Sequence, residues 1–435
     1  MVGLQWQRGN DMAHGNGPLP RRTDVAAGRG LHRPYSDVAQ KWEPRNDLLM
    51  GARRARAGAS YSAYLPGTIA GWEPQISASV ANLISLAEAA CRRMTVGVGS
   101  VDLGGLSRQL LRSEAVASSR IEGLQISHRR LARAEATPGQ DETTDRVVGN
   151  IRAMDLAVTE AATNTHITVD SLCMLHRELL AGTRDEGIGG VIRERQNWIG
   201  GEASSPIGAE FVPPPASEVA GLLADLVEFT NRSDIPPALQ AAVAHAQFET
   251  IHPFMDGNGR VGRALIHVVL SRRGVIHDMT PPVSLALAAE SRAYIAGLTS
   301  YRYGDAEDWF EVFARALGVA ATRSHEFALD VSRLQDDWRA QAGNPRRDSA
   351  SARLISLLPS MPVFKASAVD EALAISDEAT RRALIRLGAA GVIRQRSAGK
   401  RNRVWECVGL FDLMDTFERS MSPGGRGPRP TRGSR

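Results

Sequence analysis

A succession of amphipathic stretches, interrupted by one long segment rich in glycine and proline, constrains the fold of this 435-residue chain more than any other feature. In the first stretch the apolar residues Ile76, Val80, Leu83 and Ile84 recur at helical spacing. The stretches with this spacing cover residues 76–94, 107–121, 146–164, 169–180, 218–231, 238–251, 260–273 and 309–338. The pattern predicts a mainly α-helical protein.

The interrupting segment, residues 182–215, differs in texture from its surroundings. It is rich in glycine and proline and holds two short pieces with strand-like composition, residues 198–199 and 210–212. We interpret it as a loop or a β-hairpin that lies over a helical body.

A polar linker near residues 343–345 separates the last 90 residues from the rest. Beyond it, helical patterns at 353–358, 366–373 and 378–389 precede a short basic hairpin at 393–405. Three helices and a hairpin predict a winged helix-turn-helix domain over residues 350–420.

The basic residues of this domain could serve DNA. The basic residues of the wing are Arg394, Arg396, Lys400, Arg401 and Arg403. Those of the third helix, which could face a groove, are Arg381, Arg382 and Arg386. The domain's net charge of only +3 is weak for a DNA reader. DNA binding and a protein-docking or dimerisation role therefore both stay open.

The net charge of +4 arises at the two ends of the chain. Residues 1–60 carry +5 and have poor periodicity, and the last fifteen residues carry +4, so the body between them is acidic. We expect residues 1–60 and 421–435 to be basic, disordered segments. The basic ends do not make the body a nucleic-acid binder.

The cysteine count and the hydropathy exclude several classes of protein. Three cysteines lie far apart, which argues against a disulfide scaffold and a thiolate zinc site. No apolar run approaches the roughly 20 residues that a membrane helix needs, and no secretory signal opens the chain. We expect a cytoplasmic protein without a membrane partner.

Residues 252–263, HPFMDGNGRVGR, stand apart from the rest of the sequence. Pro253 breaks the preceding helix, and Gly257 and Gly259 let a backbone approach a ligand with no Cβ between them. Successive amides at the start of the next helix suit phosphate oxygens. Two arginines in the first turn oppose the helix dipole, which favours a bound anion there.

His252 and Asp256 flank this candidate phosphate site. His252 offers a base at neutral pH, and Asp256 offers a hard oxygen ligand for Mg²⁺. Together with Arg260 and Arg263 they are the parts that phosphoryl or nucleotidyl transfer needs. The other aromatic or ionisable residues of this region are expected to be structural: His245, Glu249 and Phe254.

The segment matches the Fic family motif, H-x-F-x-[DE]-G-N-G-R-x-x-R, at every specified position, and the chain resembles that family over about residues 60–330. The resemblance implies a helical N-terminal region over 61–135 and a Fic catalytic core with a β-hairpin flap over 136–340. It also implies a protein adenylyltransferase that uses ATP and Mg²⁺. Relatives imply a homodimer as well.

Carried over residue by residue, the resemblance implies a mechanism. His252 would take the proton from a Ser, Thr or Tyr hydroxyl of a target protein or of the chain itself, and Asp256 would hold Mg²⁺. Attack on the α-phosphate would leave AMP on the hydroxyl and release pyrophosphate. The remaining motif residues would bind the phosphates: Gly257, Asn258, Gly259, Arg260 and Arg263.

The sequence SSRIEG at 118–123 fits the family's inhibitory pattern, [ST]-x-x-x-E-[GN]. Ser118 and Glu122 are four residues apart and share one helix face, while Gly123 lets the helix end. In the family such a glutamate pairs with the second arginine of the motif, here Arg263, and keeps ATP from binding productively. The chain therefore resembles Fic proteins with N-terminal autoinhibition.

A third stretch resembles the family's flap hairpin, which holds the target's segment through backbone hydrogen bonds. Residues 210–215 would form its second arm. The residues of the first arm are Asn197, Trp198, Ile199, Gly200 and Gly201.

Two alternatives to adenylylation stay open. Residues 283–289 lack the aromatic side chains that many relatives place at the nucleobase pocket, so transfer of UMP competes with transfer of AMP. Phosphate transfer is less favoured, because the chain keeps Gly259 where the related Doc kinases have lysine. Outside enzymes, the alternative is a winged-helix DNA-binding regulator whose Fic core senses a nucleotide.

Overall fold

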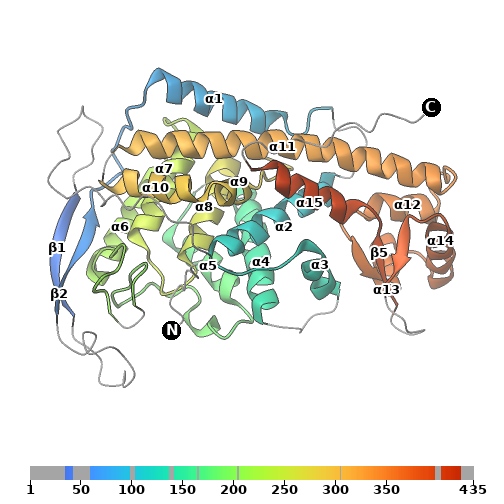
Figure 1. Ribbon diagram of the computed structural model, residues 1–435, viewed down its shortest axis with the longest axis horizontal. Coiled ribbons are helices and arrows are strands. Elements are labelled where there is room, and N and C mark those ends of the chain that lie inside the picture. Colours follow the sequence, from blue (N-terminus) through green and yellow to red (C-terminus); the bar gives the residue numbers. More distant parts are fainter. Residues whose placement is uncertain are drawn as a thin grey trace, which may run out of the picture.

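The computed structural model describes residues 35–42, 59–97, 103–136, 142–163, 166–202, 205–303, 305–396 and 403–422. Over these ranges the protein is mainly α-helical, as the periodicity predicts (Figure 1). The helices are α1 (Ala78–Arg93), α2 (Leu103–Ile121), α3 (His128–Ala136), α4 (Glu142–Thr163), α5 (Val169–Leu180), the 3₁₀ turn η2 (Glu186–Ile188), α6 (Ala216–Thr230), α7 (Pro237–Ile251), α8 (Asn258–Arg272), α9 (Val283–Ala289), α10 (Ser291–Tyr303), α11 (Ala306–Gln341), α12 (Ala350–Leu357), α13 (Ala366–Leu373), α14 (Asp377–Ala389) and α15 (Leu410–Ser420). Within the described ranges, no helix is long and apolar enough to cross a bilayer.

Helices α7 and α8 form the centre of the main body. The side chains of α7 are buried from Ala238 to Ile251, and those of α8 from Asn258 to Leu270. Helices α4, α6 and α11 pack around this pair. A helix that is buried on all faces is fixed by its neighbours, so the core holds both ends of the loop that carries residues 252–257.

The 36-residue helix α11 joins the main body to the C-terminal elements, and α1 packs along it (Figure 1). Near its start the Trp309 indole donates a hydrogen bond to the carbonyl oxygen of Ala242 in α7 (2.8 Å). Near its end Trp338 donates to the carbonyl oxygen of Val408 (3.0 Å). Both indoles are buried, which makes α11 a packed link between the two regions.

The C-terminal module, residues 350–396 and 403–422, contains the three helices and the hairpin that the sequence predicts. Strands β4 (Ile393–Gln395) and β5 (Val404–Cys407) pair antiparallel. A third strand, β3 (Val363–Lys365), pairs with the other edge of β5 and was not predicted. Helix α15 follows the sheet and returns toward α3 and α11.

The expectation of disorder over residues 1–60 is wrong for two segments. Strand β1 (Tyr35–Trp42) pairs antiparallel with β2 (Ala59–Pro66), and the remainder of 1–58 lies outside the described residues. Aromatic contacts hold this sheet on the body: Trp42 meets Trp198 edge-on, with ring centroids 5.3 Å apart. The Gly- and Arg-rich composition around β1 concealed its eight-residue strand. Residues beyond 422 also lie outside the described ranges.

The expected flap hairpin is reduced to one antiparallel bridge, between Ile199 and Phe211. The Ile199 N–H donates to the carbonyl oxygen of Phe211 (2.9 Å). The second arm also touches the N-terminal sheet, because the Tyr64 N–H donates to the carbonyl oxygen of Val212 (2.9 Å).

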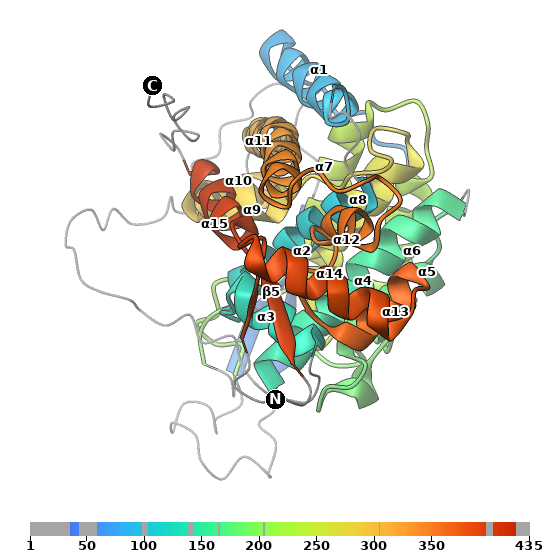
Figure 2. The same ribbon diagram turned by 90° about the vertical axis from the view of Figure 1, so that its right-hand side faces the viewer.

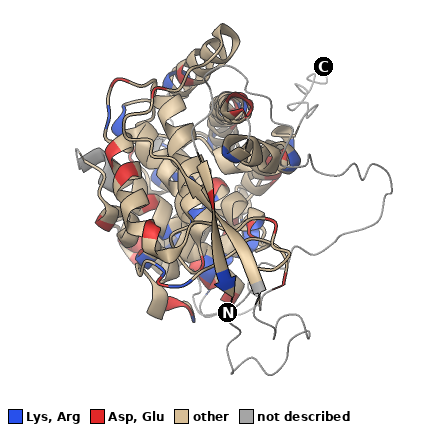
Figure 3. Ribbon diagram, turned by 90° about the vertical axis from the view of Figure 1, so that its left-hand side faces the viewer, with Lys and Arg blue, Asp and Glu red and all other residues tan. Residues whose placement is uncertain are grey.

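Acidic and basic residues are interspersed over the side of the molecule that carries this sheet (Figure 3).

Candidate active site

His252 caps the C-terminal end of α7, and its backbone is in the left-handed conformation, with φ 50° and ψ 61°. Its N–H donates to the carbonyl oxygen of Phe248 (2.9 Å), which closes the helix. Burial lowers the pKa of His252 to about 3, and the charges of Arg193 and Arg302 act in the same direction. The imidazole is therefore neutral at pH 7, the form that accepts a proton. Its Nδ1 is buried without a hydrogen-bond partner among the described residues.

Arg193 holds the turn at His252 and was not found from the sequence. Its guanidinium donates to the carbonyl oxygens of His252 (2.8 Å), Ile251 (3.3 Å) and Pro214 (2.6 Å). Carbonyls at the C-terminal end of a helix lack helical partners, and a cation there satisfies them. Arg193 thus ties the end of α7 to the second flap arm.

We expect Arg193→Met to lower the free energy of unfolding by about 3 kcal/mol, because it leaves several buried carbonyl oxygens without donors at about 1 kcal/mol each. Urea unfolding at pH 7.5 measures the change. Arg292, an exposed arginine on α10, provides the matched control. Arg292→Met should stay within about 0.5 kcal/mol of wild type, and equal stability of both variants would contradict the capping role.

Two asparagines close the loop between α7 and α8. The Asn258 side chain accepts a hydrogen bond from the Phe254 N–H (2.8 Å) and donates one to the Phe254 carbonyl oxygen (2.8 Å). Asn197, which the sequence assigned to the flap, donates to the carbonyl oxygens of Phe254 (2.8 Å) and His252 (3.2 Å). Hydrogen bonds within the loop thus occupy the Asn258 side chain. Of this residue, the backbone amide remains to bind a ligand.

His176, also not found from the sequence, supports the loop from α5. Its ring stacks on the fully buried ring of Phe254, with centroids 3.8 Å apart. The Gly190 N–H donates to Nδ1 (2.9 Å), so Nε2 carries the proton and donates to the carbonyl oxygen of Asp256 (3.0 Å). Gly257 has φ 78°, and a Cβ there would lie 2.9 Å from Cδ2 of Leu179, so the backbone conformation and the close approach both suit glycine.

The Asp256 carboxylate lies at the rim, with 34% of its side chain exposed. Oδ1 accepts from the Gly257 N–H (2.8 Å), and Oδ2 pairs with Arg146 of α4 at 2.6 Å and with Arg260 at 3.7 Å. In the described ranges, no three His, Cys, Asp or Glu side chains form a metal cluster. Mg²⁺ is commonly held by one or two carboxylates together with substrate phosphates. Asp256 fits an ion of that kind.

Arg260 is the polar group here that most needs a partner. It is only 1% exposed, and its Nε and Nη1 are buried without a hydrogen-bond partner among the described residues. Burial lowers the pKa of Arg260, against the charge of Asp256, but a guanidinium stays protonated at pH 7. A buried cation with unmet donors calls for an anion, and the start of α8 is where a phosphate would meet it.

Glu122 lies on the other arginine of the motif. Arg263 Nη2 donates to Glu122 Oε1 (2.8 Å) and to the carbonyl oxygen of Ser118 (2.9 Å), while Nε donates to Ser118 Oγ (2.9 Å). A Cβ built on Gly259 would lie 2.0 Å from Glu122 Oε1. The carboxylate therefore rests against the first turn of α8. Gly123 follows with φ 82°, just beyond the end of α2.

The remaining flap residues contact one another more than they contact the motif. The Trp198 indole donates to the carbonyl oxygen of Glu202 (2.9 Å). Gly200 and Gly201 both have φ 73°, a conformation that glycine adopts at little cost. Among the described residues, hydrogen bonds join the predicted flap to the motif loop only through Asn197.

His245 and Glu249 lie behind Arg263, in the buried interior where the sequence suggested structural roles. His245 Nε2 is 2.9 Å from the Tyr294 hydroxyl oxygen. A Cβ on Gly262 would lie 2.5 Å from Glu249 Oε1, so the two helices meet closely here. Burial raises the pKa of Glu249 to about 7 and lowers the pKa of His245 to about 3.

These shifts predict lower stability at acidic pH. Burial lowers the pKa of His176 to about 4, and that of His245 and His252 to about 3, from 6.5. Below pH 6.5 the unfolded chain binds protons that the folded chain does not, at a cost of about 1.4 kcal/mol per histidine at pH 5.5. Glu249, whose pKa rises from 4.5 to about 7, has the opposite effect: its protonation in the folded chain adds about 2 kcal/mol to the free energy of unfolding at pH 5.5.

The free energy of unfolding should thus fall by about 2 kcal/mol between pH 7.5 and pH 5.5, as measured by urea titration. Glu249→Gln removes the opposing group, so its loss over the same range should reach about 4 kcal/mol. Equal losses in the two proteins would contradict the raised pKa of Glu249.

Taken together, these residues define a helix-start anion site with a neutral base beside it. The sequence matches the Fic/DOC family over residues 166–270 and the Fic/DOC family N-terminal region over residues 95–159. The chain thus contains a Fic domain and the family's N-terminal region, and these matched regions hold the base, the arginines and Glu122.

Named relatives agree with this assignment. "Protein adenylyltransferase fic-1" of Caenorhabditis briggsae is 33% identical over 153 residues, which are 34% of this chain and 27% of that protein. "Protein adenylyltransferase Fic" of Drosophila willistoni is 33% identical over 151 residues, which are 33% of this chain and 27% of that protein. The chain thus spans about a quarter of the length of these curated relatives. A crystal structure of a Fic family protein from Desulfovibrio desulfuricans G20 covers 78% of this chain and 99% of its own, at 21% identity and TM-score 0.49.

Proposed function

We propose that this chain transfers AMP from ATP to a Ser, Thr or Tyr hydroxyl of a target protein or of itself, and that Glu122 restrains the reaction. The observation that carries the proposal is the buried guanidinium of Arg260 at the start of α8, whose Nε and Nη1 have no hydrogen-bond partner among the described residues. The names of the relatives support nucleotide transfer as the reaction.

In the proposed reaction the hydroxyl oxygen attacks the α-phosphorus of ATP while His252 takes its proton. The bond from the α-phosphorus to the bridging oxygen breaks, and pyrophosphate leaves with the electron pair. The backbone amides of Asn258 and Gly259 and the guanidinium of Arg260 would stabilise the charge on the phosphates. Asp256 would hold Mg²⁺, which supplies further neutralisation of the phosphate charge when it is bound.

Glu122 would obstruct this reaction in two ways. Its carboxylate places a negative charge against the turn that would receive the phosphates, and it takes the Arg263 donors that would hold the γ-phosphate. The resting protein would therefore bind ATP weakly or in an unproductive position.

Labelled ATP tests the type of transfer. The Glu122→Gly chain would be incubated with Mg²⁺ and ATP labelled at the α- or at the γ-phosphate, with unlabelled UTP as competitor. We expect protein-bound label from α-labelled ATP only, and no competition by UTP. Label from the γ-position would indicate a kinase, competition by UTP would indicate a uridylyltransferase, and no label with any nucleotide would favour the nucleotide-sensing regulator.

For the C-terminal module we propose a winged helix that docks protein surfaces. Three of its basic side chains already have partners in the chain: Arg394 and Arg396 bind Glu406, and Arg386 donates to the carbonyl oxygen of Ala342. These arginines are engaged rather than presented to a phosphate backbone. Lys400 and Arg401, which the sequence assigned to the wing, lie outside the described residues.

A further inference from the structure

Helix α15 of the C-terminal module lies against the segment that carries Glu122 (Figures 1 and 2). The Glu418 carboxylate accepts hydrogen bonds from Arg120 Nη2, at 3.3 Å and 3.2 Å to its two oxygens. It also lies 2.6 Å from His128 Nε2. Arg120 precedes Glu122 by two residues, and His128 begins the next helix. One carboxylate thus holds both sides of the turn at which the inhibitory helix ends.

The contact is well enough buried to be worth more than a surface ion pair. The His128 side chain is 4% exposed and that of Glu418 is 18% exposed. Burial would raise the pKa of Glu418, but the hydrogen bond from His128 and the charge of Arg120 hold it below its ordinary value. Because an ionised carboxylate only accepts, the His128 Nε2–H donates to it. The neighbouring Phe417 packs on Phe327 of α11, which anchors α15.

The first part of the inhibitory helix α2 is fixed by a separate set of contacts. Glu114 is fully buried, accepts from the Ser284 N–H (2.8 Å) and lies 3.0 Å from His267 Nε2. Asn150 of α4 donates to the carbonyl oxygen of Ala115 (2.9 Å). Withdrawing this part of the helix would separate a buried carboxylate from its partners at a cost of several kcal/mol. Release of the site by removal of the whole helix is therefore disfavoured.

The last turn of α2 makes fewer such contacts: Asn150 also donates to Ser119 Oγ (3.1 Å), and Arg263 donates to Ser118 Oγ (2.9 Å). The Glu122 N–H donates to the carbonyl oxygen of Ser119 (3.1 Å), the tighter pattern typical of a helix end. Gly123 follows in the left-handed conformation. Arg120 is the residue of this turn that reaches the C-terminal module. Arg120 thus links the turn that carries Glu122 to Glu418 of the C-terminal module.

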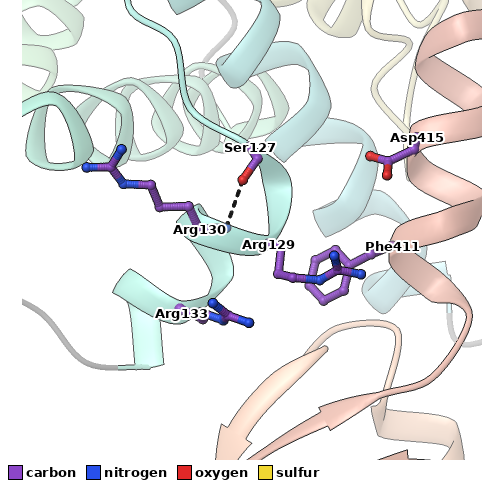
Figure 4. Close-up of a pocket in the computed structure, with 6 residues that line it drawn as sticks. All are labelled: Ser127, Arg129, Arg130, Arg133, Phe411 and Asp415. Carbon is purple, nitrogen blue, oxygen red and sulfur yellow. Dashed lines mark hydrogen bonds between the residues drawn. The ribbon is translucent and has the colours of Figure 1, made fainter. Parts of the chain in front are cut away.

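Beside this contact, charge pairs around a cavity join α3 to Glu406 of β5 and, at 4.0 Å between Arg129 and Asp412, to α15. The cavity, about 340 Å³, is lined by Ser127, Arg129, Arg130, Arg133, Phe411 and Asp415 (Figure 4). Arg129 and Arg133 approach the buried Glu406 only at 3.3 Å and 3.6 Å, since this carboxylate already binds two arginines of the wing. On this side, charged side chains and a cavity join α3 to the module, which is looser packing than the apolar contact of α15 with α11.

We propose that Glu418 is a positioning residue for Glu122. Through Arg120 and His128 it holds the last turn of α2 against Arg263, so that a shift of the C-terminal module releases the site. The inference rests on the proposed autoinhibited transferase and names what regulates it. A protein partner that docks on the C-terminal module and displaces α15 would thereby act as the activator.

Glu418→Gln tests this with Glu371→Gln, an exposed glutamate of the same module, as the matched control. We expect Glu418→Gln to raise the initial rate of AMP incorporation about tenfold over wild type, the effect of losing one charge-assisted interaction. Glu371→Gln should stay at the wild-type rate. The double variant Glu418→Gln with Glu122→Gly should incorporate AMP no faster than Glu122→Gly alone, because the contact acts through Glu122. A wild-type rate for Glu418→Gln, or additive gains in the double variant, would overturn the proposal.

Hydrogen exchange provides a readout that needs no activity. In Glu418→Gln the amides of residues 118–124 should exchange about tenfold faster than in wild type, while those around Glu114 keep their protection. Arg120→Gln should reproduce the effect, and adding it to Glu418→Gln should change nothing further. Unchanged exchange would overturn the positioning role even where the transferase is active. If Glu122→Gly proves inactive, the proposed function fails while this measurement still decides whether Glu418 holds the turn.

Discussion

Replacing Glu122 by glycine is expected to raise AMP incorporation on the order of 100-fold, from a nearly silent wild type. The carboxylate bonds Arg263 at 2.8 Å and rests on Gly259, so ATP must first break a largely buried ion pair to reach the first turn of α8. Breaking such a pair costs about 3 kcal/mol, which corresponds to about 100-fold. Intact mass after incubation with Mg²⁺ and ATP would show the added AMP on the chain or on proteins of a lysate.

A second substitution separates charge from shape at this position. Glu122→Gln keeps the side chain's size and loses its charge, so its rate should lie between those of wild type and Glu122→Gly. Silence of Glu122→Gly with ATP and with the other nucleotides would contradict autoinhibited transfer. That result would favour a core that only senses nucleotide.

The mainly helical fold was predictable because its helices carry periodic apolar faces. The spacing gave the bounds of α5 (Val169–Leu180) and α13 (Ala366–Leu373) as the structure has them. It missed α3, α9, α10 and α15, of which α3 and α15 are short and rich in charge. Charged contacts, Arg112 with Glu135 and Glu418 with His128, supplement their short apolar faces. Helix α15 buries Leu410, Phe411, Met414 and Phe417 at helical spacing, a pattern that the prediction did not use.

The motif located the candidate site because its residues are contiguous in sequence, from 252 to 263. The residues that hold those side chains in place are scattered over other elements. Arg146 comes from α4, His176 from α5 and Arg193 from the Gly- and Pro-rich segment. Each acts on backbone carbonyls or on a carboxylate brought close only by folding. A single arginine or histidine in those stretches carries no spacing signal, which is why sequence reasoning did not find them.

The second large effect is expected at His252, in the Glu122→Gly background. Removing the base should lower the initial rate of AMP incorporation by about 10³-fold, within the 10²–10⁴-fold that a positioned proton acceptor contributes. His252→Asn is the better variant, because asparagine tolerates the left-handed backbone at φ 50° that alanine adopts only at a cost of about 1 kcal/mol. It therefore removes the imidazole and leaves the turn that Arg193 caps in place.

Two further measurements separate lost chemistry from lost structure in His252→Asn. The affinity for ATP should stay within about twofold of the parent, because the phosphates are assigned to α8 and its arginines and not to the imidazole. The urea midpoint at pH 7.5 should change little, and its fall toward pH 5.5 should lessen, since one of the three neutral buried histidines is gone. A variant that binds ATP, unfolds like its parent and still incorporates AMP at the parent rate would show that another group accepts the proton.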